Sequence, residues 1–480
     1  MKLHATSLAL VFSLLMTTQL EAANSLPDIG TAGVTAMSIE REARFGQAFT
    51  RFARANQPVI NDPVLNEYVT DLGLKLLSQA DSVRFPFRFL LINDDSINAS
   101  AFLGGVVQLH TGLFLYADNE SELASVIAHE ITHVTQRHIA RYLESQSRST
   151  PLTVAGLVGS VALAVVNPQA GMAALQTTLG LKMQSAINYT RDNEFEADRI
   201  GLRLLHNAGF DPEAMAGFFQ KLADKYQFAS TPPPMLLTHP LPTSRIAEAR
   251  SRARDYPKQH YPESLDFQFA KARVMVRFQQ GSASELQRFF EQQATQGDGW
   301  QTDAARYGQA LALLKVNNHQ QARPILEGLA GKHANNIFIL DALTDLDNAQ
   351  ERYDAAIARL QAAQKHRPDN QVVTINLADS LLQAGRHPQA ATLLDNYLRR
   401  HPENLLAWEL IAQAYRPLSD ESAFRQAQAE VAALKGRYDL AVDQMEIAAN
   451  LSKDSMQRAR LGARLEQLRQ QQKEWEALRN

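Results

Sequence analysis

The pattern of hydrophobic and polar positions differs between the two halves of the chain. In the first half, the apolar and aromatic runs at 84–95 and 104–114 are typical of strands. They are followed by the segment 119–144, which has helical spacing and contains near its start Asn119 and Ser121, either of which can cap a helix. The pattern predicts one long helix there and a first half of mixed α and β structure.

The second half is helical and repetitive. Ala322, Ala356 and Ala390 stand in similar settings at a constant interval, and Pro368 and Pro402 follow the second and the third alanine at a shared distance. The interval of about 34 residues is the period of tetratricopeptide repeats, which stack as helix pairs into a solenoid. Small residues where two helices cross, with proline at the turn between repeats, are typical of that pattern. A helical bundle without repeats is the alternative.

The repeat pattern becomes less regular toward the C-terminus. Ala334 stands where the first proline is expected, Phe424 occupies the fourth small-residue position, and a further match ends at Ala441, out of register with the others. We therefore expect irregular later repeats. A linker is expected near 255–266, where two Tyr-Pro pairs interrupt the helical pattern.

Composition narrows the possible chemistry. The 480 residues include 48 Lys and Arg against 51 Asp and Glu, a net charge of −3 without a long basic run. The attraction that dominates nucleic-acid affinity is therefore missing, and we expect no nucleic-acid partner. The chain has no cysteine, which excludes disulfides, thiolate nucleophiles and Cys-ligated metal sites. Any metal must bind to His, Asp or Glu, the ligand set typical of catalytic zinc.

The N-terminus is typical of a cleavable secretory signal. A lysine precedes an apolar stretch from Ala5 to about Met16, and small residues follow at Ala22 and Ala23. We predict a signal peptide at 1–23 and, in a Gram-negative host, a mature protein in the periplasm. An uncleaved anchor is the alternative.

A second apolar segment lies at 149–181 and contains no charged side chain. Its run 152–166 is too short to cross a bilayer comfortably. A buried or re-entrant helical pair is one interpretation, and peripheral contact with a membrane or an unfolded client is the other.

The motif HEITH carries the clearest chemical signal. His129 and His133 lie about 40° apart on one face of a helix, so both imidazoles can bind one zinc ion, and Glu130 lies beside them as a candidate general base. His138 is nine residues past His129, about 180° around a continuous helix, and is expected to be a structural or surface histidine. The third ligand must come from elsewhere.

A later acidic segment offers that ligand. Glu194 and Asp198 are four residues apart and share a helical face, while Glu196 points elsewhere. Glu194 can bind the metal, and Asp198 can accept the N–H of a ligand imidazole or serve in proton transfer. A solvated acidic face is the alternative.

The order of the motifs gives a family resemblance. HEITH (129–133) is followed by EFEAD (194–198) and then HPLPTSR (239–245). Over about residues 40–255 the chain resembles the gluzincin peptidases that include the heat-shock protease HtpX and the CAAX prenyl proteases. With its repeats, and without clear transmembrane helices, it resembles more narrowly the periplasmic members that act on outer-membrane β-barrel proteins. The resemblance implies an α+β zincin-like (gluzincin) protease domain followed by an all-α TPR solenoid.

The resemblance also assigns roles to individual residues. One Zn²⁺ per chain would bind to His129, His133 and Glu194, with Glu130 as the general base. The developing oxyanion of peptide hydrolysis needs donors, and His239 and Arg245 are of the right type.

His239 lies in a proline-rich loop and allows other roles. Its imidazole could reach the zinc as a fourth ligand and hold the enzyme latent until a client displaces it, or it could be a structural loop histidine. The strand at 106–111 is a candidate edge for main-chain pairing with an extended substrate, and an internal strand of the protease core is the alternative.

These interpretations combine into one expectation. The resemblance implies a periplasmic zinc metalloendopeptidase with chaperone-like activity on misfolded or stalled outer-membrane β-barrel proteins, whose assembly machinery the TPR domain would contact. We expect a signal peptide at 1–23, a metallopeptidase domain at 24–256 and a helical repeat domain at 264–480. The alternative is a TPR chaperone or scaffold with a latent or vestigial metal site, but a decayed site would be expected to lose a ligand.

Overall fold

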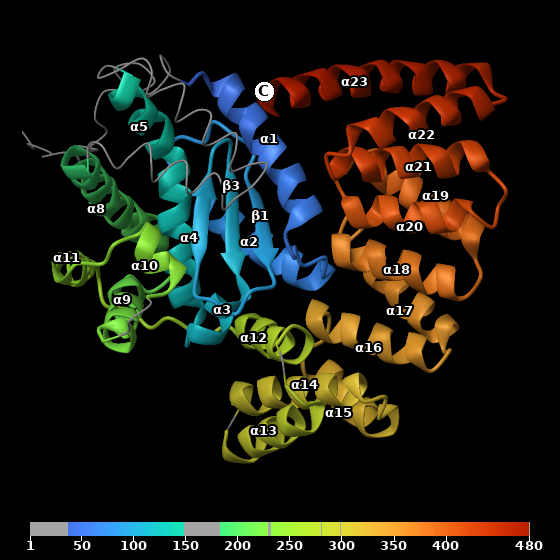
Figure 1. The fold of residues 1–480 in the computed structure, drawn as a ribbon. Coiled ribbons are helices and arrows are strands. Elements are labelled where there is room, and N and C mark those ends of the chain that lie inside the picture. The colour runs from blue at the N-terminus through green and yellow to red at the C-terminus, as the bar shows by residue number, and fades with distance from the viewer. Residues whose placement is uncertain (1–36, 148–182, 229–231, 280, 298, 480) are drawn as a thin grey trace, which may run out of the picture.

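The computed structural model describes residues 37–147, 183–228, 232–279, 281–297 and 299–479 (Figure 1). In the first half, helices surround a small sheet. The elements of this half are α1 (Ile39–Asn56), α2 (Pro63–Leu77), β1 (Arg88–Ile92), β2 (Ala99–Phe102), β3 (Val106–His110), α3 (Thr111–Tyr116), α4 (Glu120–Thr135), α5 (His138–Ser147), α8 (Met183–Asn207), α9 (Glu213–Tyr226), α10 (Pro234–Thr238) and α11 (Thr243–Ala253).

The three strands form a sheet in the order β1-β3-β2. β3 pairs parallel to β1 and antiparallel to β2. Of the two interpretations of the strand at 106–111, the structure shows the internal strand and not the edge, because β3 pairs with a neighbour on each side. The strand predicted at 104–114 is also shorter than expected, since the chain turns into α3 at Thr111, and β2 was not predicted.

The helix expected over 119–144 is broken in two. Gln136 caps the end of α4, and Arg137 adopts a positive φ of 54° before α5 begins. The Arg137 side chain is buried, where its Nε donates to Glu42 Oε2 at 2.9 Å and its Nη2 donates to the carbonyl of Met37 at 2.6 Å. These tertiary contacts with the start of α1 explain the bend, which no Gly or Pro in the sequence predicts.

The second half consists of antiparallel helices. They are α12 (Leu265–Arg277), α13 (Ala283–Gln296), α14 (Gly299–Lys315), α15 (His319–Lys332), α16 (Ile337–Ala349), α17 (Tyr353–His366), α18 (Gln371–Gln383), α19 (His387–Leu398), α20 (Leu405–Tyr415), α21 (Glu421–Leu434), α22 (Tyr438–Leu451) and α23 (Ser455–Arg479).

The predicted repeat is confirmed by the positions of these helices. α15, α17 and α19 begin at equal intervals, and α16, α18 and α20 begin at the same intervals. Ala322, Ala356 and Ala390 are each the fourth residue of their helix and are fully buried. Small side chains at these positions let neighbouring helices approach closely, as the period predicts. The predicted architecture, an α+β first half followed by an all-α solenoid of helix pairs, is thereby confirmed.

The solenoid curls around the first half, and α23 returns to α1 at the marked C-terminus (Figure 1). One hydrophobic core continues from α2 and α4 into α12, α14 and α16. At its edge lies a seam cluster, defined as Asp62, Arg273, Arg277 and Asp341, in which Arg273 Nε lies 2.8 Å from Asp62 and Nη1 lies 2.6 Å from Asp341. The two halves are thus held by shared apolar packing and by buried charge pairs.

Two predicted segments fall outside this description. The signal peptide at 1–23 and the apolar segment 149–181, with its run 152–166, lie outside the described residues. Within the described part of the chain, no helix combines the length and apolar character needed to span a membrane.

Candidate metal centre

α4 carries the HEITH motif in the interior of the first half of the chain. Its N-terminus is capped by Asn119, one of the two predicted caps, whose side chain accepts from the backbone N–H of Glu122 at 3.0 Å. The helix is buried along most of its length, with His129 2% exposed and Glu130 fully buried. The motif therefore lies in the protein interior, where charged or polar side chains need hydrogen-bond or ion-pair partners.

α8 brings the second motif to the first. Ala197 is fully buried, and a Cβ atom at Gly201 would lie 3.3 Å from the backbone nitrogen of His129. These small residues allow α8 to pack closely on α4, and this places Glu194 beside the two imidazoles. The predicted long-range pairing of the HEITH and EFEAD segments is present in the structure.

Four side chains converge on one point. His133 Nε2 lies 3.0 Å from His129 Nε2 and 3.4 Å from Glu194 Oε1, and His129 Nε2 lies 3.3 Å from Glu194 Oε2. His239 Nδ1 lies 3.3 Å from His129 Nε2 and 3.1 Å from both Glu194 oxygens. Among the described residues, His129, His133, Glu194 and His239 form a group whose ligand atoms lie within 4.8 Å of one another. The structure thus places His239 among the three predicted ligands.

Glu130 faces the same point from the side. Its Oε1 lies 3.5 Å from His239 Nε2, and both carboxylate oxygens are buried without a hydrogen-bond partner among the described residues. A buried carboxylate without a partner is costly for folding and is a feature of sites kept for chemistry.

Asp198 and Arg245 lie behind the ligands. Asp198 Oδ1 is 3.0 Å from His129 Nδ1, on the side of the imidazole that faces away from the cluster. Arg245 donates from Nε and Nη2 to Asp198 at 2.7 and 2.8 Å, and from Nη1 to Glu194 Oε2 and the Pro240 carbonyl at 2.8 Å. Arg245 is 2% exposed, and its guanidinium contacts two carboxylates and a backbone carbonyl behind the ligand atoms, a geometry that favours a positioning role over the expected donation to the oxyanion.

His133 has a partner that the sequence analysis did not assign. Its Nδ1 lies 2.8 Å from His138 Nδ1, and His138 Nε2 lies 3.2 Å from Glu196 Oε2. The prediction placed His138 on the far side of a continuous helix, but the bend at Arg137 turns it toward His133. Glu196 does point away from the ligand atoms, as predicted, and it ends this chain of contacts.

The charges of the site are unbalanced. Glu130, Glu194 and Asp198 contribute three negative charges, and Arg245 contributes one positive charge, which leaves two negative charges with neutral imidazoles. Burial disfavours a proton on His129, but hydrogen bonding to Asp198 and Glu194 outweighs burial and raises the pKa of His129 to about 10. Burial and the neighbouring His129 lower the pKa of His133 well below its usual value. The site thus favours a positive charge between its donor atoms.

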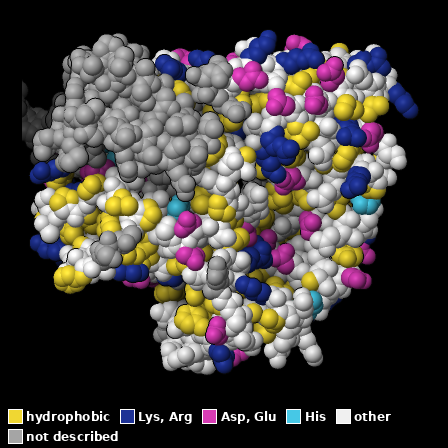
Figure 2. Space-filling model, viewed as in Figure 1, with side chains coloured by type: hydrophobic (Ala, Val, Ile, Leu, Met, Phe, Trp, Pro, Cys, Tyr) yellow, Lys and Arg dark blue, Asp and Glu magenta, His cyan; other side chains and the backbone are white. Residues whose placement is uncertain are grey.

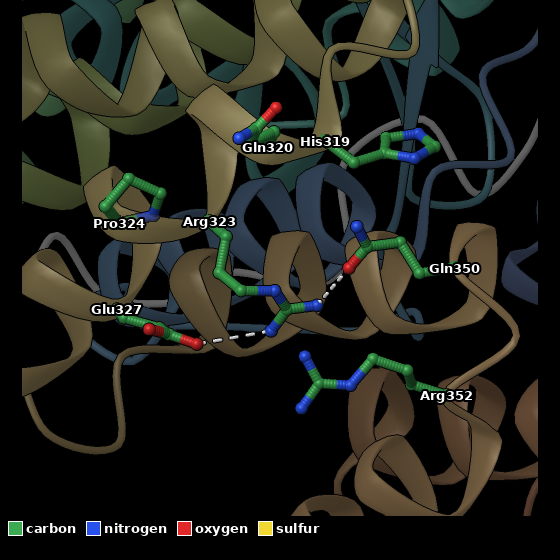
Figure 3. Close-up of a pocket in the computed structure, with 7 residues that line it drawn as sticks. All are labelled: His319, Gln320, Arg323, Pro324, Glu327, Gln350 and Arg352. Atoms are coloured by element: carbon green, nitrogen blue, oxygen red, sulfur yellow. Dashed lines mark hydrogen bonds and ion pairs between the residues drawn. The ribbon is translucent and has the colours of Figure 1, made fainter.

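A groove of about 550 Å³ lies elsewhere, in the solenoid (Figure 3). Its central guanidinium, Arg323, is committed to Glu327 at 3.2 Å, to Gln350 at 2.5 Å and to the buried Asp347 at 2.6 Å. Positive and negative side chains are interspersed over the face of the solenoid in view (Figure 2). This groove shares no residue with the His and Glu cluster.

Comparison with known proteins agrees with both halves of the structure. Residues 63–253 match Peptidase family M48, and residues 348–414 match a tetratricopeptide repeat family. The chain is 45% identical to the Beta-barrel assembly-enhancing protease of Escherichia coli K12 over 94% of this chain and 93% of that one. It is 44% identical, with the same shares covered, to the protein of that name from Yersinia pestis. Metalloprotease LoiP of Escherichia coli K12 is 27% identical over 35% of this chain and 63% of that protein.

Proposed function

This chain belongs to the family of beta-barrel assembly-enhancing proteases, with a catalytic half of Peptidase family M48, and from that premise we propose a periplasmic zinc endopeptidase with chaperone-like activity. Its clients would be misfolded or stalled outer-membrane β-barrel proteins. The observation that carries the chemistry is the convergence of His129, His133 and Glu194 beside the buried Glu130.

Zinc fits the donor set. Two imidazoles and a carboxylate are typical ligands of catalytic zinc, and tetrahedral bonds of about 2.0–2.2 Å separate ligand atoms by about 3.3–3.6 Å. The separations of 3.0–3.4 Å among His129, His133 and Glu194 are close to that value. With both imidazoles neutral, as metal ligands must be, the two uncompensated negative charges also match a divalent cation. When bound, zinc would supply a Lewis acid that polarises a peptide carbonyl and acidifies water.

The remaining side chains act on protons and geometry. Glu130 is proposed to accept a proton from the attacking water and to pass it to the leaving amine, as a general base and then a general acid. Asp198 would accept the Nδ1–H of His129 and keep its Nε2 lone pair directed at the cation. Arg245 would hold Asp198 and Glu194 in register.

His239 supports a latent resting state. Three roles were open for it, and its Nδ1 lies 3.1–3.3 Å from His129 and Glu194, which favours a fourth ligand over an oxyanion donor or a structural residue. In this position it fills the coordination place that a substrate carbonyl would need. Displacement of α10 and the following loop by a client would then start catalysis.

The solenoid would recruit clients and their assembly machinery. Its helices share one hydrophobic core with α2 and α4, so a bound client would lie next to the protease half. We propose domain limits of 24–256 and 264–480, supported by the residues between α11 and α12, which are all described and form neither helix nor strand. The signal peptide at 1–23, the periplasmic location and membrane contact through 152–166 remain predictions.

Zinc content and cleavage of an unfolded client test the proposal together. The purified protein should contain one zinc per chain by mass spectrometry and should cleave casein or an unfolded β-barrel protein. Glu130→Gln should keep the zinc and lose at least about 10²-fold in rate. Client binding without zinc, or near-normal cleavage by Glu130→Gln, would instead favour the chaperone or scaffold.

The latch has its own test. His239→Ala should raise the rate of client cleavage at unchanged zinc content, whereas an oxyanion donor would lower the rate. His260→Ala, which changes an exposed histidine between α11 and α12, is the matched control. No change in either direction would leave His239 as a structural residue.

A further inference from the structure

We propose that His138 and Glu196 form a positioning relay that fixes His133 for metal binding. The inference rests on the proposed function, because it needs His133 to be a zinc ligand. Neither residue touches the cluster of ligand atoms, and both act through the imidazole of His133. They are therefore positioning residues and not catalytic ones.

The direction of the hydrogen bonds follows from the geometry. His133 Nε2 faces His129 and Glu194, so this nitrogen must keep its lone pair for the cation and the proton must be on Nδ1. His133 Nδ1 then donates to His138 Nδ1 at 2.8 Å. A neutral His138 that accepts at Nδ1 carries its own proton on Nε2, which lies 3.2 Å from Glu196 Oε2. One set of tautomers satisfies the whole chain of contacts.

The fold holds this chain of contacts in place. His138 is 3% exposed and is the first residue of α5, directly after the bend at Arg137. Had α4 continued, His138 would point away from His133. Arg141, one turn further along α5, donates to Glu196 Oε2 at 2.8 Å and fixes the far end of the relay. The bend therefore not only connects two helices but also directs His138 toward His133.

The two histidine ligands are supported in different ways from the same helix. His129 contacts Asp198 directly, and His133 reaches Glu196 through the second imidazole. Glu194, Glu196 and Asp198 all belong to α8, which supplies one ligand and the acceptors behind the other two. Acceptors of this kind raise ligand basicity and fix ring orientation, and their loss typically costs about 10–100-fold in metal affinity.

The test measures zinc affinity in the full chain. Zinc dissociation constants are obtained by competition with a chromophoric chelator for the wild type, His138→Ala, Glu196→Ala and the double variant. We expect about 10–100-fold weaker binding for His138→Ala and a smaller loss for Glu196→Ala. The double variant should bind no more weakly than His138→Ala alone, because Glu196 acts through His138.

Matched variants distinguish a loss of His133 positioning from a general loss of protein stability. Glu196→Gln keeps an acceptor and should bind zinc more tightly than Glu196→Ala. Glu248→Gln, which removes a carboxylate paired with Arg252 on α11, and His260→Ala should leave the zinc dissociation constant unchanged. The cobalt(II) absorption bands of His138→Ala should shift relative to the wild type, which a loss of stability alone would not produce.

The outcomes distinguish the relay from the function on which it rests. A wild-type chain that binds no zinc overturns both. A wild type that binds zinc, together with equal dissociation constants in folded His138→Ala and Glu196→Ala, overturns the relay alone. Should His138→Ala not fold, the partly exposed Glu196 provides the deciding pair of variants, and equal affinity for Glu196→Ala and Glu196→Gln contradicts the relay.

Discussion

The seam cluster and the metal centre are both buried groups of charges, but they differ in how their charges are matched. In the seam cluster, Arg273 is fully buried between Asp62 and Asp341, and its Nη1 also donates to Tyr307 at 3.2 Å. In the metal centre, carboxylates outnumber the single guanidinium, and Glu130 has no hydrogen-bond partner within the part of the chain that the structure describes.

This difference separates a structural ion cluster from a site. Buried charges that stabilise the fold are paired, because the desolvation cost of an unpaired buried charge exceeds the attraction that its neighbours provide. A functional site retains charged groups whose partner is a bound metal or substrate. Without that partner, these groups lower the stability of the protein. Burial of polar residues alone would not have told the two clusters apart.

Arg273→Met should have the largest effect on stability. Removing the guanidinium leaves the buried Asp62 and Asp341 with only Arg277, at 3.4 and 3.8 Å, as a countercharge. We expect a cost of about 3 kcal/mol in the free energy of unfolding, measured by urea denaturation. Zinc affinity should not change, since none of the seam residues contacts the metal ligands. A loss below about 1 kcal/mol would show that the cluster is dispensable to the fold.

Arg245→Met should also destabilise, by about 3 kcal/mol, because Asp198 and Glu194 lose their shared countercharge. Unlike the seam variant, it should weaken zinc binding by about 10–100-fold, because both carboxylates lose their orientation. Chelator competition on the folded variant measures this. Unchanged zinc affinity would contradict the role assigned to Arg245.

Glu130→Gln should act in the opposite sense on stability. The change removes a fully buried charge that lacks a hydrogen-bond partner among the described residues, so the metal-free protein should gain about 1 kcal/mol in the free energy of unfolding. Urea denaturation of chelator-treated wild type and variant gives the comparison. A loss of similar size would mean that His239, whose Nε2 lies 3.5 Å from Glu130 Oε1, compensates the Glu130 charge.

Glu403→Gln should have the smallest effect. Glu403 pairs with Arg88 across the two halves at 2.9 Å, but its side chain is 56% exposed, so the pair should contribute less than about 1 kcal/mol and should weaken with salt. The urea midpoint at low and high salt measures both. A loss above about 1 kcal/mol in the free energy of unfolding would show that this surface pair contributes to holding the two halves together.

The repeat half was predictable because its signal is periodic. Ala356 and Ala390 fixed the register of helices whose starts the structure places at the interval of the alanines. Stacked helix pairs make mostly local contacts, so a local sequence pattern is sufficient. In the protease half, the central position of β3 depends on pairing with β2, which the sequence pattern did not reveal.

The sequence predicted the metal ligands of the site but not the residues that hold those ligands in place. HEITH and EFEAD identify His129, His133 and Glu194 because helical spacing fixes which side chains share a face. The turn that brings His138 to His133 depends on the buried Arg137 and its contact with Glu42, 95 residues away. For Arg245, a signal was available: two carboxylates on one buried helical face require a countercharge.

The placement of Glu194, Glu196 and Asp198 on α8 has a consequence for how the protein can vary. Each residue added to or removed from a helix turns everything beyond it by about 100°. A one-residue deletion between Asp198 and Gly201 would therefore misdirect all three acidic groups together relative to the glycine at which α8 packs closely on α4. Natural sequence variation among catalytically competent relatives should accordingly include substitutions along this helix but no insertions between its acidic positions and the small residues that seat it on α4.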